Sequence, residues 1–175
     1  ALVSFFRTLR RTDAKKPGAI TRVSHWGDSQ IVADNITFAI RRVLQKRFGD
    51  AGHGFVGVGQ PNGYRHKDVW HWSNSKWRFA GVAQGYKKDH YYGLATLHAY
   101  TGQYGAIAKY ATKPDQVVGQ RVSRIEVSYL EHGLGGRFQV QVDDGEKQLV
   151  DTRRTEGKRE AVLRLKGPDG LHKLS

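Results

Sequence analysis

Cysteine and methionine are both absent from the 175 residues. Without cysteine, the chain can form no disulfide and supply no thiolate as a nucleophile or ligand. Without methionine it has no initiator residue, so we expect a processed or partial product. No apolar run reaches the roughly 18 residues of a membrane-spanning helix, and we therefore expect no membrane span. None of these absences indicates a cellular compartment.

Acidic residues are scarce: 16 Asp and Glu stand against 29 Lys and Arg, which gives a formal net charge of +13. A surplus of this size attracts polyanions such as nucleic acid, anionic lipid or acidic glycan. The basic residues are scattered in short pairs, however, and no helix-turn-helix, zinc-finger spacing or aromatic RNA-binding signature accompanies them. Nucleic-acid association is therefore only a third alternative for the function.

The first third of the chain has the periodicity of helices. Apolar residues at helical spacing predict a short helix over Leu2–Thr12 and a longer amphipathic one over Ile31–Phe48. Gly49 is placed to end the second helix. Ile20–Trp26 is predicted to be a buried strand, so that this region reads as strand, tight turn and helix.

The turn between that strand and helix consists of Gly27, Asp28 and Ser29. A serine at the amino end of a helix is suited to be a nucleophile, since unpaired backbone N–H groups there can stabilise an oxyanion. In this interpretation Gly27 gives the turn room and Asp28 hydrogen-bonds the local backbone. The alternative is that Asp28 or Ser29 simply caps an ordinary helix.

Helical periodicity disappears after Tyr64. Several short runs of strand-forming residues are separated by turn residues, and Asp143-Asp144-Gly145 is a hairpin signal. This pattern predicts an antiparallel β-sandwich of jelly-roll type. We place the boundary between the two parts near residue 60, with domains at 1–60 and 61–175.

Aromatic residues are dense in the second part. Trp70, Trp72 and Trp77 are candidates for stacking against sugar rings, although aromatic residues on strands also pack into cores. The histidines show no convincing metal-ligand spacing, so we expect neither a metal nor another cofactor.

Two blocks resemble the opening of the GDSL/SGNH hydrolases: His25–Asp34, which reads HWGDSQIVAD, and Arg41–Val56, which reads RRVLQKRFGDAGHGFV. The similarity is to the bacterial polysaccharide and peptidoglycan O-acetylesterases, in which a carbohydrate-binding-like β-sandwich is inserted after the first helix. It implies an α/β plus all-β fold. Residues 1–60 would begin a flavodoxin-like three-layer domain, and 61–175 would be the inserted jelly-roll module.

The resemblance implies that Ser29 is the nucleophile and that its N–H contributes to the oxyanion hole. The family pattern also requires a Gly-x-Asn loop and a late Asp-x-x-His, and neither is found in its expected context. Asp50-Ala51-Gly52-His53 matches the second in letters. It lies beyond a helix about 25 Å long, however, too far for a base that must approach the hydroxyl.

The chain is therefore expected to be the N-terminal part of a serine esterase that deacylates O-acylated glycan. The base and the remaining domain would be supplied by residues beyond Ser175 or by a second chain, so this chain alone is expected to be inactive. The resemblance favours a periplasmic or extracellular location. A non-catalytic carbohydrate-binding or scaffold protein is the alternative.

Overall fold

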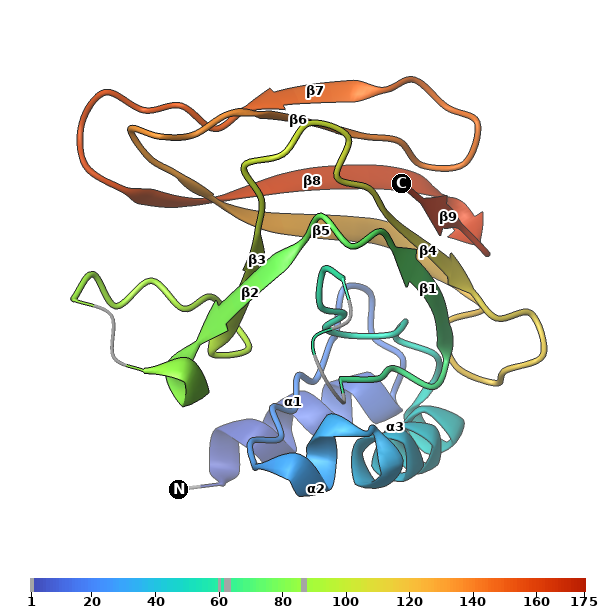
Figure 1. The fold of residues 1–175 in the computed structure, drawn as a ribbon. Coiled ribbons are helices and arrows are strands. Elements are labelled where there is room, and N and C mark those ends of the chain that lie inside the picture. The colour runs from blue at the N-terminus through green and yellow to red at the C-terminus, as the bar shows by residue number, and fades with distance from the viewer. Residues whose placement is uncertain (1, 60, 62–63, 86–87) are drawn as a thin grey trace.

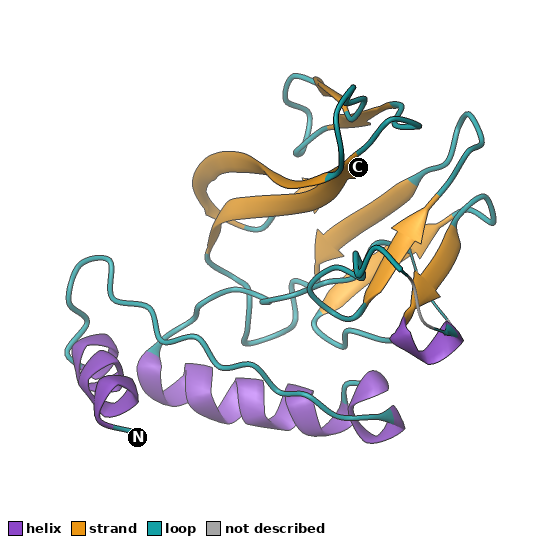
Figure 2. Cartoon of the chain, turned by 90° about the vertical axis from the view of Figure 1, so that its left-hand side faces the viewer, coloured by secondary structure: helices purple, strands orange, loops and turns teal. Residues whose placement is uncertain are grey.

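The computed structural model describes residues 2–59, 61, 64–85 and 88–175. Three helices, α1 (Val3–Asp13), α2 (Ser29–Val32) and α3 (Asn35–Phe48), lie together on one side of the molecule (Figure 1). The helix predicted over Leu2–Thr12 is confirmed as α1, which contacts α3. In both views the strands lie on the other side (Figure 2).

The long helix predicted over Ile31–Phe48 is interrupted at Asp34. This residue has a left-handed backbone (φ 58°, ψ 27°) and separates the single turn of α2 from α3. Its side chain is buried and accepts hydrogen bonds from the Thr37 hydroxyl and from the Lys67 amide, the latter at 2.8 Å. A contact 33 residues away along the chain therefore stabilises the break.

Among the described residues, the strands form four small antiparallel sheets, in the orders β1-β4-β9, β2-β3, β5-β8 and β6-β7. Their bounds are β1 (Val69–Ser73), β2 (Arg78–Gly81), β3 (Leu97–Tyr100), β4 (Ala108–Thr112), β5 (Val122–Glu131), β6 (Arg137–Val140), β7 (Gln148–Asp151), β8 (Arg159–Gly170) and β9 (Lys173–Leu174). A 3₁₀ turn, η1 (Val82–Gln84), follows β2. The hairpin predicted at Asp143-Asp144-Gly145 is confirmed, because it joins the paired strands β6 and β7.

The predicted fold class is wrong. Ile20–Trp26 has no regular structure, and every ladder between two of the strands described is antiparallel, so nothing in the described chain resembles a flavodoxin-like three-layer domain. A strand forms only where a partner accepts its hydrogen bonds, and this stretch finds none among the described residues. The later strands are antiparallel, as predicted, but they form four small sheets and match the two packed sheets of a jelly roll only weakly.

Apolar burial is slight for a chain of this length. Among the described residues the buried apolar side chains are Val69, Val118, Val140, Val150 and Leu165. No residue of α1, α2 or α3 is buried. The apolar stripe expected on the second helix includes Ile36, Ile40 and Val43, which are exposed, and Val32 and Leu44, which are half-buried. Within the described chain, this face of α3 is therefore only partly covered.

Polar contacts join the helices to the strands instead. Arg41 on α3 binds Asp68 immediately before β1, and Asp50 after α3 binds the loop before β5. Arg42 adds a hydrogen bond of 3.3 Å to Gln116. The relative position of the two parts therefore depends more on these buried or half-buried polar contacts than on an apolar core.

Candidate functional site

Ser29 is the first residue of α2 and is exposed. Asp28 caps this helix, because its Oδ1 accepts a hydrogen bond of 3.0 Å from the Gln30 amide. Asp28 thus makes the backbone contact predicted for it. Gly27 has no left-handed backbone, and a Cβ there would lie 3.4 Å from Ile31 Cδ1, an ordinary contact.

No base accompanies Ser29 in the part of the chain that the structure describes. Neither its hydroxyl nor its amide takes part in a hydrogen bond there, and His25, four residues upstream, is exposed. Within the described residues, Ser29 is therefore an accessible serine whose amide and hydroxyl make no hydrogen bond.

The Asp50-x-x-His53 block lies at the other end of α3 and has a structural role. The Asp50 carboxylate accepts hydrogen bonds from three consecutive amides, at 2.9 Å from Gly119, 2.7 Å from Gln120 and 3.1 Å from Arg121. It therefore fixes the loop that leads into β5. A carboxylate used in this way does not orient a catalytic histidine.

His53 is half-buried against His66, with ring centroids 5.6 Å apart. Its Nε2 lies 3.0 Å from the Thr112 hydroxyl, and His66 Nε2 lies 3.0 Å from the His53 carbonyl. Burial, helped by the neighbouring His66, lowers the pKa of His53 to about 4. Burial also lowers the pKa of His66, with Arg41 acting in the same direction. Both rings are neutral at pH 7, and His53 is a weak base.

A buried ionic network, not predicted from the sequence, lies beside these histidines. Arg41 Nη2 is 2.8 Å from a carboxylate oxygen of Asp34 and 2.8 Å from one of Asp68. Burial opposes ionisation of Asp34, but hydrogen bonds from Arg41, Thr37 and the Lys67 amide outweigh it and lower its pKa. The sequence feature that could have indicated this network is Asp34 itself, an acidic residue within the amphipathic run predicted to be one helix.

His172 and Asp143 form a pair that looks like part of a catalytic triad. His172 Nδ1 lies 2.7 Å from Asp143 Oδ2, but Nε2 lies 2.8 Å from the Pro168 carbonyl. Since a carbonyl only accepts, Nε2 must donate, and it cannot take a proton from a serine. The hydrogen bond to Asp143 raises the pKa of His172, against the opposing effect of burial. The pair ties the end of β8 to the β6–β7 hairpin.

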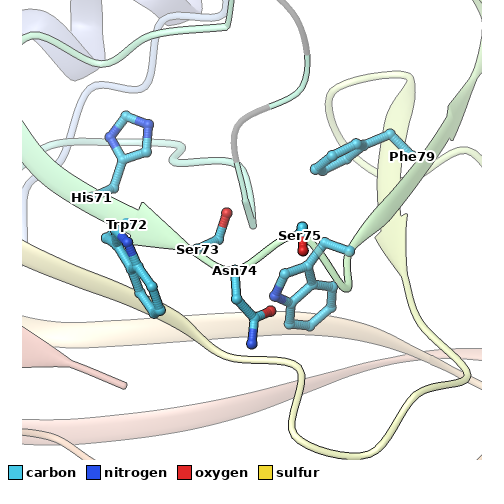
Figure 3. Close-up of a pocket in the computed structure, with 7 residues that line it drawn as sticks. His71, Trp72, Ser73, Asn74, Ser75 and Phe79 are labelled. Atoms are coloured by element: carbon cyan, nitrogen blue, oxygen red, sulfur yellow. The ribbon is translucent and has the colours of Figure 1, made fainter.

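The strands carry a hollow of about 370 Å³, here called the Trp72–Trp77 hollow. Its lining residues come from β1, from the following turn and from β2: His71, Trp72, Ser73, Asn74, Ser75, Trp77 and Phe79. Trp72 and Asn74 project on one side of the chain, and His71 and Ser73 on the other (Figure 3). Two of the three predicted stacking residues, Trp72 and Trp77, therefore lie in one hollow, whereas Trp70 is exposed outside it.

Among the described residues, no group of three or more histidine or acidic side chains is arranged to hold a metal ion. In the same part of the chain, no helix is long and apolar enough to cross a membrane. Comparison with models of protein families and with curated proteins gives no match to this chain.

Proposed function

We propose that this chain carries the nucleophile of a serine esterase of the SGNH type, which removes acyl groups, acetyl in the first instance, from an O-acylated polysaccharide or peptidoglycan. The observation that carries the proposal is Ser29 itself. It is exposed in a turn held by the Asp28–Gln30 contact, and its hydroxyl and amide are unengaged in the described chain.

The reaction assigns two roles to Ser29. Its Oγ attacks the acyl carbonyl carbon and gives its proton to a base, while its N–H stabilises the oxyanion. Collapse of the intermediate breaks the ester bond and releases the glycan hydroxyl, with the proton returned to the leaving oxygen. Water then hydrolyses the acyl-serine and releases the carboxylic acid.

The base belongs to polypeptide outside residues 1–175 in this proposal. Support comes from the histidines and the helices of this chain. His53, His66 and His172 are engaged in structural contacts. The apolar stripe of α3 is only partly covered within the described residues, because Ile36, Ile40 and Val43 are exposed. A further part of the same protein, or a second chain, would cover that stripe and bring the base to Ser29.

Glycan binding without catalysis is the second candidate, and the Trp72–Trp77 hollow favours it. Indole faces stack on the apolar faces of sugar rings, and the Ser73 and Ser75 hydroxyls in the lining are suited to sugar hydroxyls. In the esterase the same hollow would hold the polymer near Ser29's domain.

The two candidates are separated by measuring acetate release from O-acetylated glycan with the intact protein. Loss of acetate release in Ser29→Ala, with glycan binding retained, supports the esterase. Glycan binding with no acetate release in either form supports the non-catalytic protein.

A further inference from the structure

Acidic residues are almost missing from the segment that forms the hollow. Residues 69–113, which include β1, β2, β3 and β4, contain six lysines and arginines but a single acidic residue, Asp89. Among the residues that line the hollow there is no carboxylate. This local imbalance is independent of the resemblance that suggested an esterase, and it bears on the charge of the ligand.

One cation of this segment lies directly at an aromatic wall of the hollow. Lys109 on β4 is the register partner of Trp72 on β1, and its Nζ lies 6.0 Å from the centre of the Trp72 ring. Lys109 is exposed and, within the described chain, forms no ion pair with a carboxylate. Its charge therefore remains available to a ligand.

The part of the hollow formed by Asn74 and Trp77 is fixed by hydrogen bonds before any ligand binds. Asn74 donates to the Gly105 carbonyl at 2.8 Å and accepts from the Ile107 amide at 3.2 Å. Trp77 Nε1 donates to the Ile107 carbonyl at 3.0 Å, and Lys76 donates to the Tyr104 carbonyl at 2.7 Å. A wall fixed in advance loses little conformational entropy on binding, as a specific site requires.

We propose that the Trp72–Trp77 hollow binds a negatively charged glycan, one whose sugar rings bear carboxylates, with Lys109 pairing with the charge. This inference rests on the proposed function in taking the ligand to be a glycan. The lining favours a sugar over a single-stranded nucleic acid. Nucleic acids bind to successive aromatic platforms along a continuous cationic groove, whereas here hydroxyl and amide groups separate two indoles.

The test compares two ligands with the same sugar rings, one charged and one neutral. Oligogalacturonate and its fully methyl-esterified form share the same rings, but the second is neutral. We expect calorimetric titration of the full chain at low salt to give a dissociation constant at least about tenfold lower for the charged ligand. We also expect this difference to shrink toward 1 M salt, where the screening length falls to about 3 Å.

Two matched pairs of variants locate the site. Trp72→Ala should abolish measurable binding, whereas Trp70→Ala should leave it unchanged, because the two residues share a strand and are 46% and 49% exposed but only Trp72 lines the hollow. Lys109→Gln should weaken the charged ligand about three- to tenfold and leave the neutral ligand unaffected. Lys147→Gln, an exposed lysine between β6 and β7, should change neither.

Equal binding of the two ligands, or no binding of either, would overturn the inference. So would tighter binding of an oligodeoxythymidylate with the same dependence on Trp72 and Lys109, since the hollow would then be a nucleic-acid site. The titrations are repeated with Ser29→Ala. Charge-selective binding, together with no acyl release by the unsubstituted protein, upholds the inference and removes the esterase. Acyl release by the unsubstituted protein without charge-selective binding supports the esterase and overturns the inference about the hollow.

Discussion

Arg41 Nη2 lies 2.8 Å from Oδ2 of Asp68, whose side chain is completely buried. The two residues are 27 positions apart, and their contact joins α3 to the start of β1. Asp34 completes the arrangement from the other side of the guanidinium, so that one positive charge faces two buried negative charges. Because apolar burial is slight, we expect the stability of the chain to depend strongly on this network.

Replacing Arg41 by methionine should destabilise the chain by about 3–5 kcal/mol, since it leaves two buried carboxylates without a counter-charge. The free energy of unfolding in urea measures the effect. Arg47→Met is the matched control on the same helix. Its contact with Asp13 is 3.8 Å long and exposed, so a change below about 0.5 kcal/mol is expected. Similar losses in the two variants would contradict the account.

Gly119 is required where Asp50 and His53 meet the loop before β5. Its backbone has φ +79°, and a Cβ would lie 2.0 Å from Cε1 of His53. Gly119→Ala should therefore cost roughly 2–4 kcal/mol through overlap and backbone strain. At Gly102 nothing lies within 4 Å of an added Cβ and φ is ordinary, so Gly102→Ala should leave the melting temperature nearly unchanged. Equal shifts in melting temperature would refute the packing of His53 against Gly119.

Acid should destabilise the chain because His66 is buried, and His53 half-buried, as neutral rings. Their pKa values are lowered, that of His53 to about 4, whereas both rings bind a proton near pH 6.5 in the unfolded chain. Between these values the unfolded chain binds more protons, so the free energy of unfolding decreases as the pH is lowered.

The loss from His53 is on the order of 3 kcal/mol between about pH 6.5 and pH 4. Urea midpoints measured across this range should decrease steadily as the pH is lowered. A midpoint that is constant down to pH 4.5 would show that these rings are not buried as neutral groups.

His172 should produce the opposite dependence above neutrality. Asp143 raises its pKa, so its contribution to stability is complete below about pH 6.5 and is lost as pH rises through the higher folded value. The melting temperature should therefore decline as the pH rises above about 6.5. In His172→Gln this decline should be absent. An unchanged slope in that variant would assign the decline to another group.

The sequence correctly predicted the helices and the hairpin whose conformation is determined by residues close together in the chain. Periodicity located α1 and α3, and turn chemistry located the β6–β7 hairpin. The sequence-based prediction was wrong where contacts with residues far away in the chain determine the backbone conformation. The break at Asp34 depends on the Lys67 amide and on Arg41, and Ile20–Trp26 has strand-forming residues but no partner strand in the described chain.

In the candidate site, too, local features could be predicted from the sequence and long-range contacts could not. The sequence is sufficient to place Ser29 at a helix start and to exclude His53 as its base, because helix length separates the two. It could not show that His53 packs against Gly119, or that Trp72 and Trp77, but not Trp70, share a hollow. Those facts depend on pairings between β1 and β4 and on the loop at residues 104–107, which are set by the tertiary structure.

The most direct test of the account is covalent trapping of Ser29. The intact protein is treated with an alkyl fluorophosphonate and digested with trypsin, which yields the peptide Val23–Arg41 with two serines, Ser24 and Ser29. The account predicts that the phosphonyl group is on Ser29, and that Ser29→Ala loses both the adduct and acetate release. Acetate release that persists in Ser29→Ala, or an adduct on Ser24 instead, would contradict the assignment of Ser29 as the nucleophile.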